Sequence, residues 1–332
     1  GTIYYYVVIS FPELGDGACS VITSEIVDII VYQIPILSDF TTTICSGDTF
    51  SIDPDETNGD IVPIGTTYTW SAPVIDPVGA ILGFSGETTP QNNISQTLSN
   101  PISGVIATAT YTVIPNSQIC VGDPFTIVVT VNPQINVEAI VTNSACFEID
   151  NAQIEITITG GVPFTTGNPF NISWNGPNGY TSTDEDIENL EPGTYTLIIT
   201  DSEGCEFTDT YIITQPEELL LGSLDVFEDI TCFGFDDGQI AVTIIGGTLD
   251  YTYQWKRNGV DYPGEENLTN LPPGVYVLTV TDENGCVLVL DPLEIIEPAL
   301  LTITLIEKVD IDCYGFNTGS IDIEATGGRP GY

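Results

Sequence analysis

The chain has 332 residues, of which 42% are apolar and 15% are charged. Its 47 acidic residues outnumber 4 basic ones, which gives a formal net charge of −43 at pH 7. Nucleic acids and anionic lipid surfaces are also polyanions, so this charge argues against them as partners. Histidine is absent, which excludes Ser-His-Asp and Cys-His catalytic arrangements. No apolar run approaches the ~18 residues that span a bilayer, so we expect no transmembrane segment.

Residues 37–133 are predicted to form the first complete β domain. Cys45 begins a strand region, and Cys120 follows the turn of a predicted hairpin. Residues 1–36 repeat only the second half of this plan, with Cys19 in the place of Cys120. We therefore expect residues 1–36 to be the C-terminal part of a similar domain.

Three blocks with a common beginning follow, at residues 134–216, 217–298 and 299–332. Each has a cysteine, then a strand isoleucine and then a Gly-Gly pair, at the same spacing in every block: Cys146, Ile154 and Gly160; Cys232, Ile240 and Gly246; Cys313, Ile321 and Gly327. The interval between the starts of successive copies is long enough for a small autonomous β domain and too long for a solenoid repeat. The last block contains only the N-terminal part of this pattern.

Apolar residues alternate with polar ones in each block, as in QIEITITG, and this period of two predicts strands with one buried face. Residues 190–205, LEPGTYTLIITDSEGC, and 271–286, LPPGVYVLTVTDENGC, predict a strand, a tight turn and a cysteine directly after it. Pro133, Pro216 and Pro298 mark short, stiff connections between blocks. We therefore predict a series of small all-β sandwiches.

Each complete block has one cysteine near its first strand and one at its hairpin turn. We predict a disulfide between the two cysteines of each block: Cys45–Cys120, Cys146–Cys205 and Cys232–Cys286. Cys19 and Cys313 then pair outside this sequence. Metal-thiolate clusters need close C-x2-C pairs, which the sequence lacks. Such a disulfide frame implies an oxidising, extracytoplasmic setting.

Two acidic loops are candidate calcium sites, because hard cations take six to eight oxygen ligands. The candidate ligands are Asp53, Asp55, Glu56, Asn58 and Asp60 in one loop, and Asp184 and Asp186, with Glu185 and Glu188 beside them, in the other. A solvated acidic loop is the alternative in both places. Apart from calcium, the sequence suggests no cofactor.

The acids of the two turns, Asp201, Glu203, Asp282 and Glu283, are predicted to form the turns, with a cation shared across a joint as the alternative. Trp70, Trp174 and Trp255 occupy corresponding strands, so we expect them in the cores rather than on a sugar-binding surface.

Several motifs together resemble known modules. Blocks 134–216 and 217–298, with CFGFDDGQI, the Gly-Gly pair, Trp255 and LPPGVYVLTVTDENGC, resemble SprB-type repeats. Those repeats occur in giant surface adhesins of gliding Bacteroidota, which the type IX secretion system exports. Residues 37–133, with CSGDTF, TYTWS and CVGDPFTIVVTVNP, resemble the PKD-like, immunoglobulin-type modules of the same kind of protein. Block 134–216 departs from the pattern, since it reads CFEIDNAQ where its neighbours have C-x-G-F-x-x-G.

The resemblance implies an all-β, elongated, disulfide-stapled tandem array of small immunoglobulin-like β-sandwich domains. It implies a non-enzymatic segment of an extracellular, cell-surface adhesin or filament, acting as a stalk or spacer in adhesion and gliding motility. The implied partners are further repeats of the same long chain, surface, secretion-system or motility proteins, and surface polysaccharide. Two alternatives stay open: a direct carbohydrate- or protein-binding module, and an accessory region of a secreted hydrolase.

Overall fold

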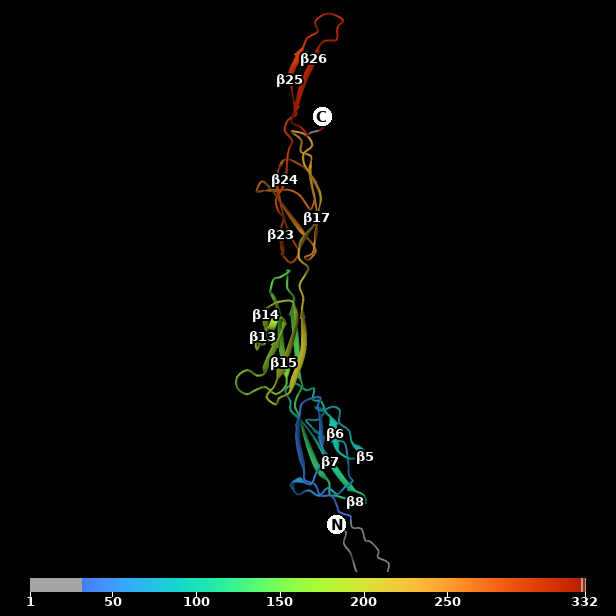
Figure 1. Ribbon diagram of the computed structural model, residues 1–332. Helices are drawn as coiled ribbons and strands as arrows, with labels where there is room; N and C mark the ends of the chain where they lie inside the picture. The colour runs from blue at the N-terminus through green and yellow to red at the C-terminus, as the bar shows by residue number, and fades with distance from the viewer. Residues whose placement is uncertain (1–31, 330, 332) are drawn as a thin grey trace, which may run out of the picture. The chain divides into compact units, whose positions relative to one another are not determined.

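The computed structural model describes residues 32–329 and 331, so Cys19 and most of the predicted segment 1–36 lie outside the described residues. In the described part, strands form the regular structure together with two 3₁₀ turns, η1 (Thr57–Gly59) and η2 (Pro177–Gly179), and there is no α-helix (Figure 1). The predicted all-β fold is confirmed. Among these residues no helix is long and apolar enough to cross a membrane.

The chain clusters into two compact units. The first comprises the residues up to Glu138 together with Thr157–Ile172 and Ile198–Thr208. The second comprises Ala139–Ile156, Ser173–Leu197 and Asp209–Tyr332. Block 134–216 therefore contributes residues to both units. The domain boundaries expected near the three connecting prolines stay a prediction.

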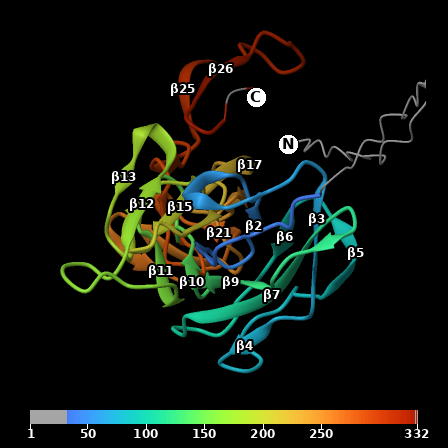
Figure 2. The same cartoon turned by 90° about the horizontal axis from the view of Figure 1, so that it is seen from below.

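Two sheets enclose the core of block 37–133. The larger has the order β1-β9-β7-β3-β5, with β4 and β8 also paired to β7, and β2 and β6 form a small second sheet (Figure 1, Figure 2). β1 runs parallel to β9, with Ile44 opposite Val131. Alternate residues of β7 and β9 are buried, as the alternating sequence predicts. The strands are β1 (Phe40–Ile44), β2 (Thr49–Ile52), β3 (Thr66–Trp70), β4 (Val74–Asp76), β5 (Glu87–Gln91), β6 (Ile94–Thr97), β7 (Ala107–Ser117), β8 (Cys120–Val121) and β9 (Phe125–Val131).

Block 134–216 is built from a sheet of order β10-β11-β14 and a sheet of order β13-β12-β15-β16. Its inward residues include Trp174 and Leu197, both at 0% exposure. The strands are β10 (Ile135–Thr142), β11 (Ala152–Gly160), β12 (Asn171–Asn175), β13 (Thr181–Ser182), β14 (Ile187–Leu190), β15 (Gly193–Thr200) and β16 (Glu206–Ile213).

Block 217–298 repeats this plan, with a sheet of order β17-β18-β21 and a sheet of order β20-β19-β22-β23 in which β24 also pairs with β22. Trp255, Tyr276 and Leu278 belong to the core between the sheets. The strands are β17 (Leu220–Glu228), β18 (Gly238–Ile245), β19 (Thr252–Arg257), β20 (Val260–Tyr262), β21 (Leu268–Leu271), β22 (Gly274–Thr281), β23 (Val287–Val289) and β24 (Leu293–Ile295).

The last block contains one antiparallel pair, β25 (Thr302–Val309) and β26 (Ser320–Thr326). Ile321 and Ile323 are 71% and 54% exposed, whereas the matching Ile240 and Val242 of the preceding block are buried. The difference arises because the preceding block has a second sheet that covers this face.

Candidate functional site

Two disulfides link cysteines of different blocks. Cys45 is bonded to Cys205, 160 residues later, and Cys146 is bonded to Cys286, 140 residues later. Each bond joins the first-strand cysteine of one block to the turn cysteine of the next. This corrects the predicted pairing within blocks: the structure contains none of Cys45–Cys120, Cys146–Cys205 and Cys232–Cys286, and among the described residues Cys120, Cys232 and Cys313 are free thiols.

Strand length explains the correction in block 134–216. The nine-residue strand β11 separates Cys146 from the Gly-Gly pair, and the turn that carries Cys205 is hydrogen-bonded just beyond that pair, at Val162. A strand of this length covers about 30 Å, whereas a disulfide needs Cα atoms within about 7 Å. The two cysteines of the block therefore lie at opposite ends of one strand. Each meets a cysteine of a neighbouring block, with Cα atoms 5.5 and 5.7 Å apart.

The parallel pairing of β1 with β9 explains the correction in block 37–133. Cys45 follows Ile44, which lies opposite Val131 at the end of β9, whereas Cys120 precedes the start of β9. The length of β9 again separates the two cysteines. The sequence shows both cysteines of a block but not which end of the sandwich each one reaches.

We call the region around Cys45–Cys205 the first joint; it lies within the first unit. A buried carboxylate shapes the turn that carries Cys205. Asp201 is 2% exposed and accepts hydrogen bonds of 2.9 Å from the backbone N–H groups of Glu203, Cys205 and Val162. The predicted turn-forming role of Asp201 is confirmed, and its third bond also fixes the turn to the Gly-Gly loop.

The region around Cys146–Cys286, which lies within the second unit, is the second joint and has the same arrangement. Asp282 is 5% exposed and accepts hydrogen bonds from the N–H of Cys286 at 2.8 Å and of Thr248 at 2.9 Å. Asn284 of this turn also donates to the carbonyl of Ala145 at 3.0 Å. The turn of one block is thus bonded to the loop that precedes the first-strand cysteine of the block before it.

The Gly-Gly pair holds the chain that enters its block. Gly161 donates its N–H to the carbonyl of Gln134 at 3.1 Å, just after Pro133. Gly160 has φ +76°, and a Cβ there would lie 2.0 Å from the same carbonyl oxygen. Only glycine allows both this backbone conformation and this approach. The sequence showed the repeated pair, but its contact with the connection was not predicted.

The later connections are held in the same way. Gly247 donates to the carbonyl of Glu217 at 2.8 Å, and Gly328 donates to that of Ala299 at 2.7 Å. Every repeat therefore fixes its own entry segment against its Gly-Gly pair before the chain continues into the sandwich.

The third joint lies around Arg329, which follows the last Gly-Gly pair. Its guanidinium donates to the carbonyls of Asp229 at 3.0 Å and Ile230 at 2.7 Å, close in sequence to the free Cys232. The hydroxyl and backbone N–H of Thr231 lower the pKa of Asp237, which shapes the same loop. The last block thus contacts the loop of Cys232 even though it forms no disulfide there.

The first candidate calcium loop forms local hydrogen bonds. Asp55 accepts from the hydroxyl and, at 3.0 Å, from the N–H of Thr57, and these bonds hold the pKa of Asp55 below its ordinary value. Asp60 accepts from the N–H of Ser38 at 2.9 Å and from its hydroxyl at 3.2 Å. Asn58 lies in η1, and its side chain is outside the described part. Asp53 and Glu56 complete the predicted set.

In the second candidate loop, Asp186 accepts from the N–H of Ile156 at 2.8 Å, and Asp184 bonds the hydroxyl of Ser182 at 3.1 Å. These acids line a hollow of about 370 Å³ together with Glu155 and Glu188. Nevertheless, no three His, Cys, Asp or Glu side chains of the described residues are grouped as a metal ion requires. Calcium binding at either loop stays a prediction.

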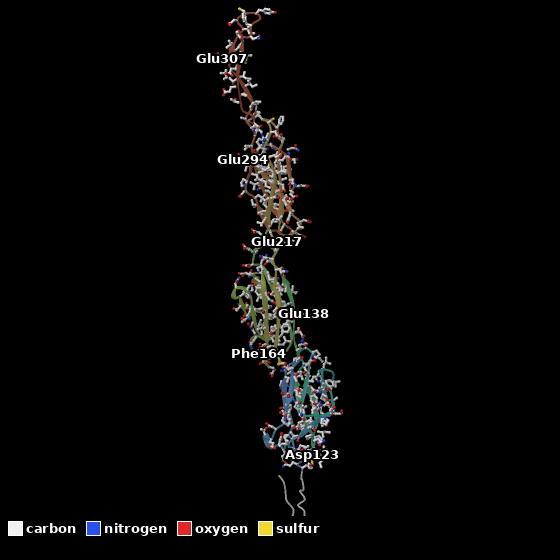
Figure 3. The ribbon with its side chains drawn as sticks, turned by 45° about the vertical axis from the view of Figure 1, so that its right-hand side comes forward. Asp123, Glu138, Phe164, Glu217, Glu294 and Glu307 are labelled. Carbon is white, nitrogen blue, oxygen red and sulfur yellow. A yellow bond between two sulfur atoms is a disulfide. The ribbon has the colours of Figure 1, made fainter. Side chains whose placement is uncertain are left out.

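The three tryptophans lie in the cores, as the sequence predicts. Trp70 is 5% exposed, Trp174 0% and Trp255 1%, so none of them offers a surface on which a sugar ring could stack. Their indole N–H groups donate to loop carbonyls of Ser85, Asp184 and Glu265. Acidic side chains instead cover the outside, such as the exposed Glu217, Glu294 and Glu307 (Figure 3).

Comparison with known families gives two matches. Residues 42–135 match the family model of the PKD-like domain, and residues 224–260 and 305–332 match that of the SprB repeat. No curated protein sequence matches the chain significantly.

Several solved structures are similar to parts of this chain. A three-immunoglobulin structure of titin domains I67–I69, an E-to-A variant, is 12% identical, with a TM-score of 0.30 and coverage of 77% of this chain and 94% of that one. The eight N-terminal Ig domains of DSCAM are 14% identical, with a TM-score of 0.39 and coverage of 79% and 36%. Sidekick-1 immunoglobulin domains 1–5 are 14% identical, with a TM-score of 0.28 and coverage of 89% and 66%. Nothing about function follows from these likenesses.

The matched modules are structural and adhesive rather than catalytic, and together they form a repeat-array segment of the adhesin type. The SprB repeats and the disulfides indicate an extracellular surface protein. The chain thus combines a PKD-like domain at residues 42–135 with SprB repeats at residues 224–260 and 305–332.

Proposed function

We propose that this chain is a tension-bearing spacer in a surface adhesin, with gliding motility as the process that loads it. Its partners are then the neighbouring repeats of the same long chain and the surface or motility proteins that hold and move it. The observation that carries the proposal is that each disulfide joins one block to the next. A disulfide within a block would protect only that block, whereas these bonds reinforce the places where two blocks meet.

The main chain between the cysteines supports this proposal. The segment from Cys205 to Cys232 is short, and most of it belongs to the two long strands β16 and β17. The segment from Cys286 to Cys313 is equally short and includes β23, β24 and β25. Strand backbone already rises about 3.3 Å per residue, close to the limit of a stretched chain. Tension can therefore lengthen the strands of these segments only slightly.

Stretching single molecules held at their two ends tests the mechanical role. Reduced and fully unfolded, the 332 residues extend to about 1,100 Å. In the oxidised chain the shortest covalent route crosses Cys45–Cys205 and Cys146–Cys286. That route contains roughly 150 residues and extends to about 500 Å. If the extended length were the same before and after reduction, the disulfides would not carry the tension.

Two serine variants make the stretching measurement specific. Cys45→Ser should lengthen the oxidised route by roughly 40 residues, or about 140 Å. Cys232→Ser is the matched control and should leave the length unchanged, because its thiol is free. A longer oxidised chain in the control would contradict the proposed connections.

Binding measurements separate the spacer from a binding module. The oxidised chain is screened against a panel of surface polysaccharides and against outer-surface proteins. The spacer proposal expects no saturable binding to the described blocks. Saturable binding that a substitution on one block abolishes would assign direct recognition to that block instead.

A further inference from the structure

The two disulfides overlap along the sequence, and this has a consequence beyond bearing tension. Cys45–Cys205 spans every peptide bond between those residues, and Cys146–Cys286 spans every bond between its own pair. Because Cys146 precedes Cys205, no peptide bond from Cys45 to Cys286 is left without a disulfide across it. We infer that the disulfides keep the chain covalently whole after the main chain is cut anywhere between Cys45 and Cys286.

The overlap is specific to pairing between successive blocks. If each block instead had its own internal disulfide, no disulfide would span the peptide bonds from Cys120 to Cys146 or those from Cys205 to Cys232. Those intervals contain the connections at Pro133, which is buried, and at Pro216, which is followed by the exposed Glu217 and Glu218. Exposed connections are preferred places for proteolytic cleavage. The observed pairing therefore also spans the connections between blocks, including the exposed Glu217 and Glu218.

Hydrolysis of a peptide bond leaves the disulfide that spans it intact. Hydrolysis adds water across one peptide C–N bond and produces a carboxylate and an amine, and no electrons are transferred. The disulfides need a reductant to open, so a protease acting alone does not release them. A cut chain therefore separates only when the bond that spans the cut is also reduced.

Trypsin tests this inference on the chain itself, since the sequence contains only Lys256, Arg257, Lys308 and Arg329 as basic residues. Free thiols are alkylated, the oxidised chain is unfolded in urea, and it is then cleaved. Unfolding removes the non-covalent contacts that could hold fragments together. On a non-reducing gel, residues 1–256 should stay joined to residues 258–308 through Cys146–Cys286. The same sample should separate after reduction.

Serine variants identify the bond that holds these fragments. Cys146→Ser should release residues 258–308 without reductant, whereas the matched control Cys232→Ser should leave them joined. Separation in the control, retention in Cys146→Ser, or separation in the unmodified chain would each overturn the inference. Mass spectrometry of linked peptides from the unmodified chain gives the same answer if Cys146→Ser fails to fold.

A new cleavage site between Cys120 and Cys146 tests the first disulfide. Ile140 lies in β10 with 66% of its surface exposed, so Ile140→Lys adds a trypsin site at little structural cost. Pairing between blocks predicts that residues 1–140 stay attached through Cys45–Cys205. Their release without reductant would overturn the inference. Adding Cys45→Ser should produce that release. These outcomes do not depend on tension, so this inference and the proposed spacer role can fail separately.

Discussion

At the scale of single residues, a few buried polar groups shape the joints. Asp201 and Asp282 are nearly inaccessible, yet each accepts hydrogen bonds from backbone N–H groups of its own turn and of the Gly-Gly loop. A buried carboxylate is tolerated when backbone donors replace its hydration. These residues therefore place the turn cysteines at the joints.

Removing this carboxylate should weaken the second joint. Asp282→Ala leaves the N–H groups of Thr248 and Cys286 without their acceptor, and we expect the free energy of unfolding to fall by about 2–4 kcal/mol. Urea unfolding followed by tryptophan fluorescence measures the change. Asp291→Ala, at an exposed position, is the control and should stay within about 0.5 kcal/mol. Equal effects of both substitutions would contradict the role of Asp282.

Two tyrosines connect the start of a strand to the turn before it. Tyr195 donates to the carbonyl of Glu191 at 2.9 Å, and Tyr276 donates to that of Pro272 at 2.8 Å. Burial is the main cause that raises the pKa of Tyr276 to about 12. Burial likewise raises the pKa of Tyr68 to about 12.

Tyr276 should make stability depend on alkaline pH. Its pKa is higher in the folded chain than its ordinary value of 10, so its protonated phenol stabilises the fold fully below pH 10. This contribution is lost as the pH rises from 10 through about 12. Tyr276→Phe should cost about 1 kcal/mol near neutral pH, because one buried hydrogen bond is removed.

Urea unfolding at pH 8, 10 and 11.5 measures this dependence. The free-energy difference between the unmodified chain and Tyr276→Phe should shrink as the pH rises, because only the unmodified chain can ionise there. Tyr68 is present in both and cancels in the difference. A difference that stays constant across this range would contradict the assignment.

At the scale of elements, the Gly-Gly pair and the entry segment act together. At Gly246, φ is +75° and a Cβ would lie 1.8 Å from the carbonyl oxygen of Glu218. Gly285 has a similar φ of +85°, but nothing lies within 4 Å of its Cβ position. Comparing the two positions therefore separates the energetic effect of the left-handed backbone from that of the close contact with Glu218.

Gly246→Ala should therefore destabilise the chain more than Gly285→Ala. The second substitution costs about 1–2 kcal/mol for the left-handed conformation alone. The first also pushes the entry segment away from the Gly-Gly pair, and we expect at least about 3 kcal/mol in total. Thermal and urea unfolding of the two variants give the comparison. Similar losses in both would show that the contact with Glu218 contributes nothing.

At the scale of the whole molecule, unbalanced charge opposes folding. The net charge is −43, and the described residues contain one ion pair, Lys308–Asp310, at 2.6 Å between exposed groups. Such a pair contributes little, so repulsion between carboxylates dominates the electrostatics of the surface. The disulfides oppose this repulsion between carboxylates by holding neighbouring blocks together.

Salt should accordingly stabilise the protein. The Debye length falls from about 30 Å at 0.01 M to about 8 Å at 0.15 M salt, which screens repulsion between carboxylates. We expect the melting temperature to rise by several degrees over this range in NaCl. Calcium chloride at matched ionic strength shows whether the acidic loops add specific binding. A melting temperature that does not change with NaCl would contradict the role of repulsion.

Much of the architecture follows from the sequence alone. Alternating apolar residues, repeated turn phrases and the position of each tryptophan predict the strands and cores, because burial on one face of a strand depends on a local period of two. The sequence also predicts the turn-forming role of Asp201. It does not predict the contact between Gly160 and Gln134, because that contact depends on how the chain folds back on itself.

The pairing of cysteines is the feature that only the tertiary structure decided. The sequence places two cysteines in each complete block, and pairing them within the block is the simplest prediction. β11 and β9 carry the two cysteines of a block to opposite ends of its sandwich, so each disulfide joins a cysteine of one block to a cysteine of another. Local sequence determined which residues form strands and turns. Strand length and direction determined that the covalent bonds connect one block with the next.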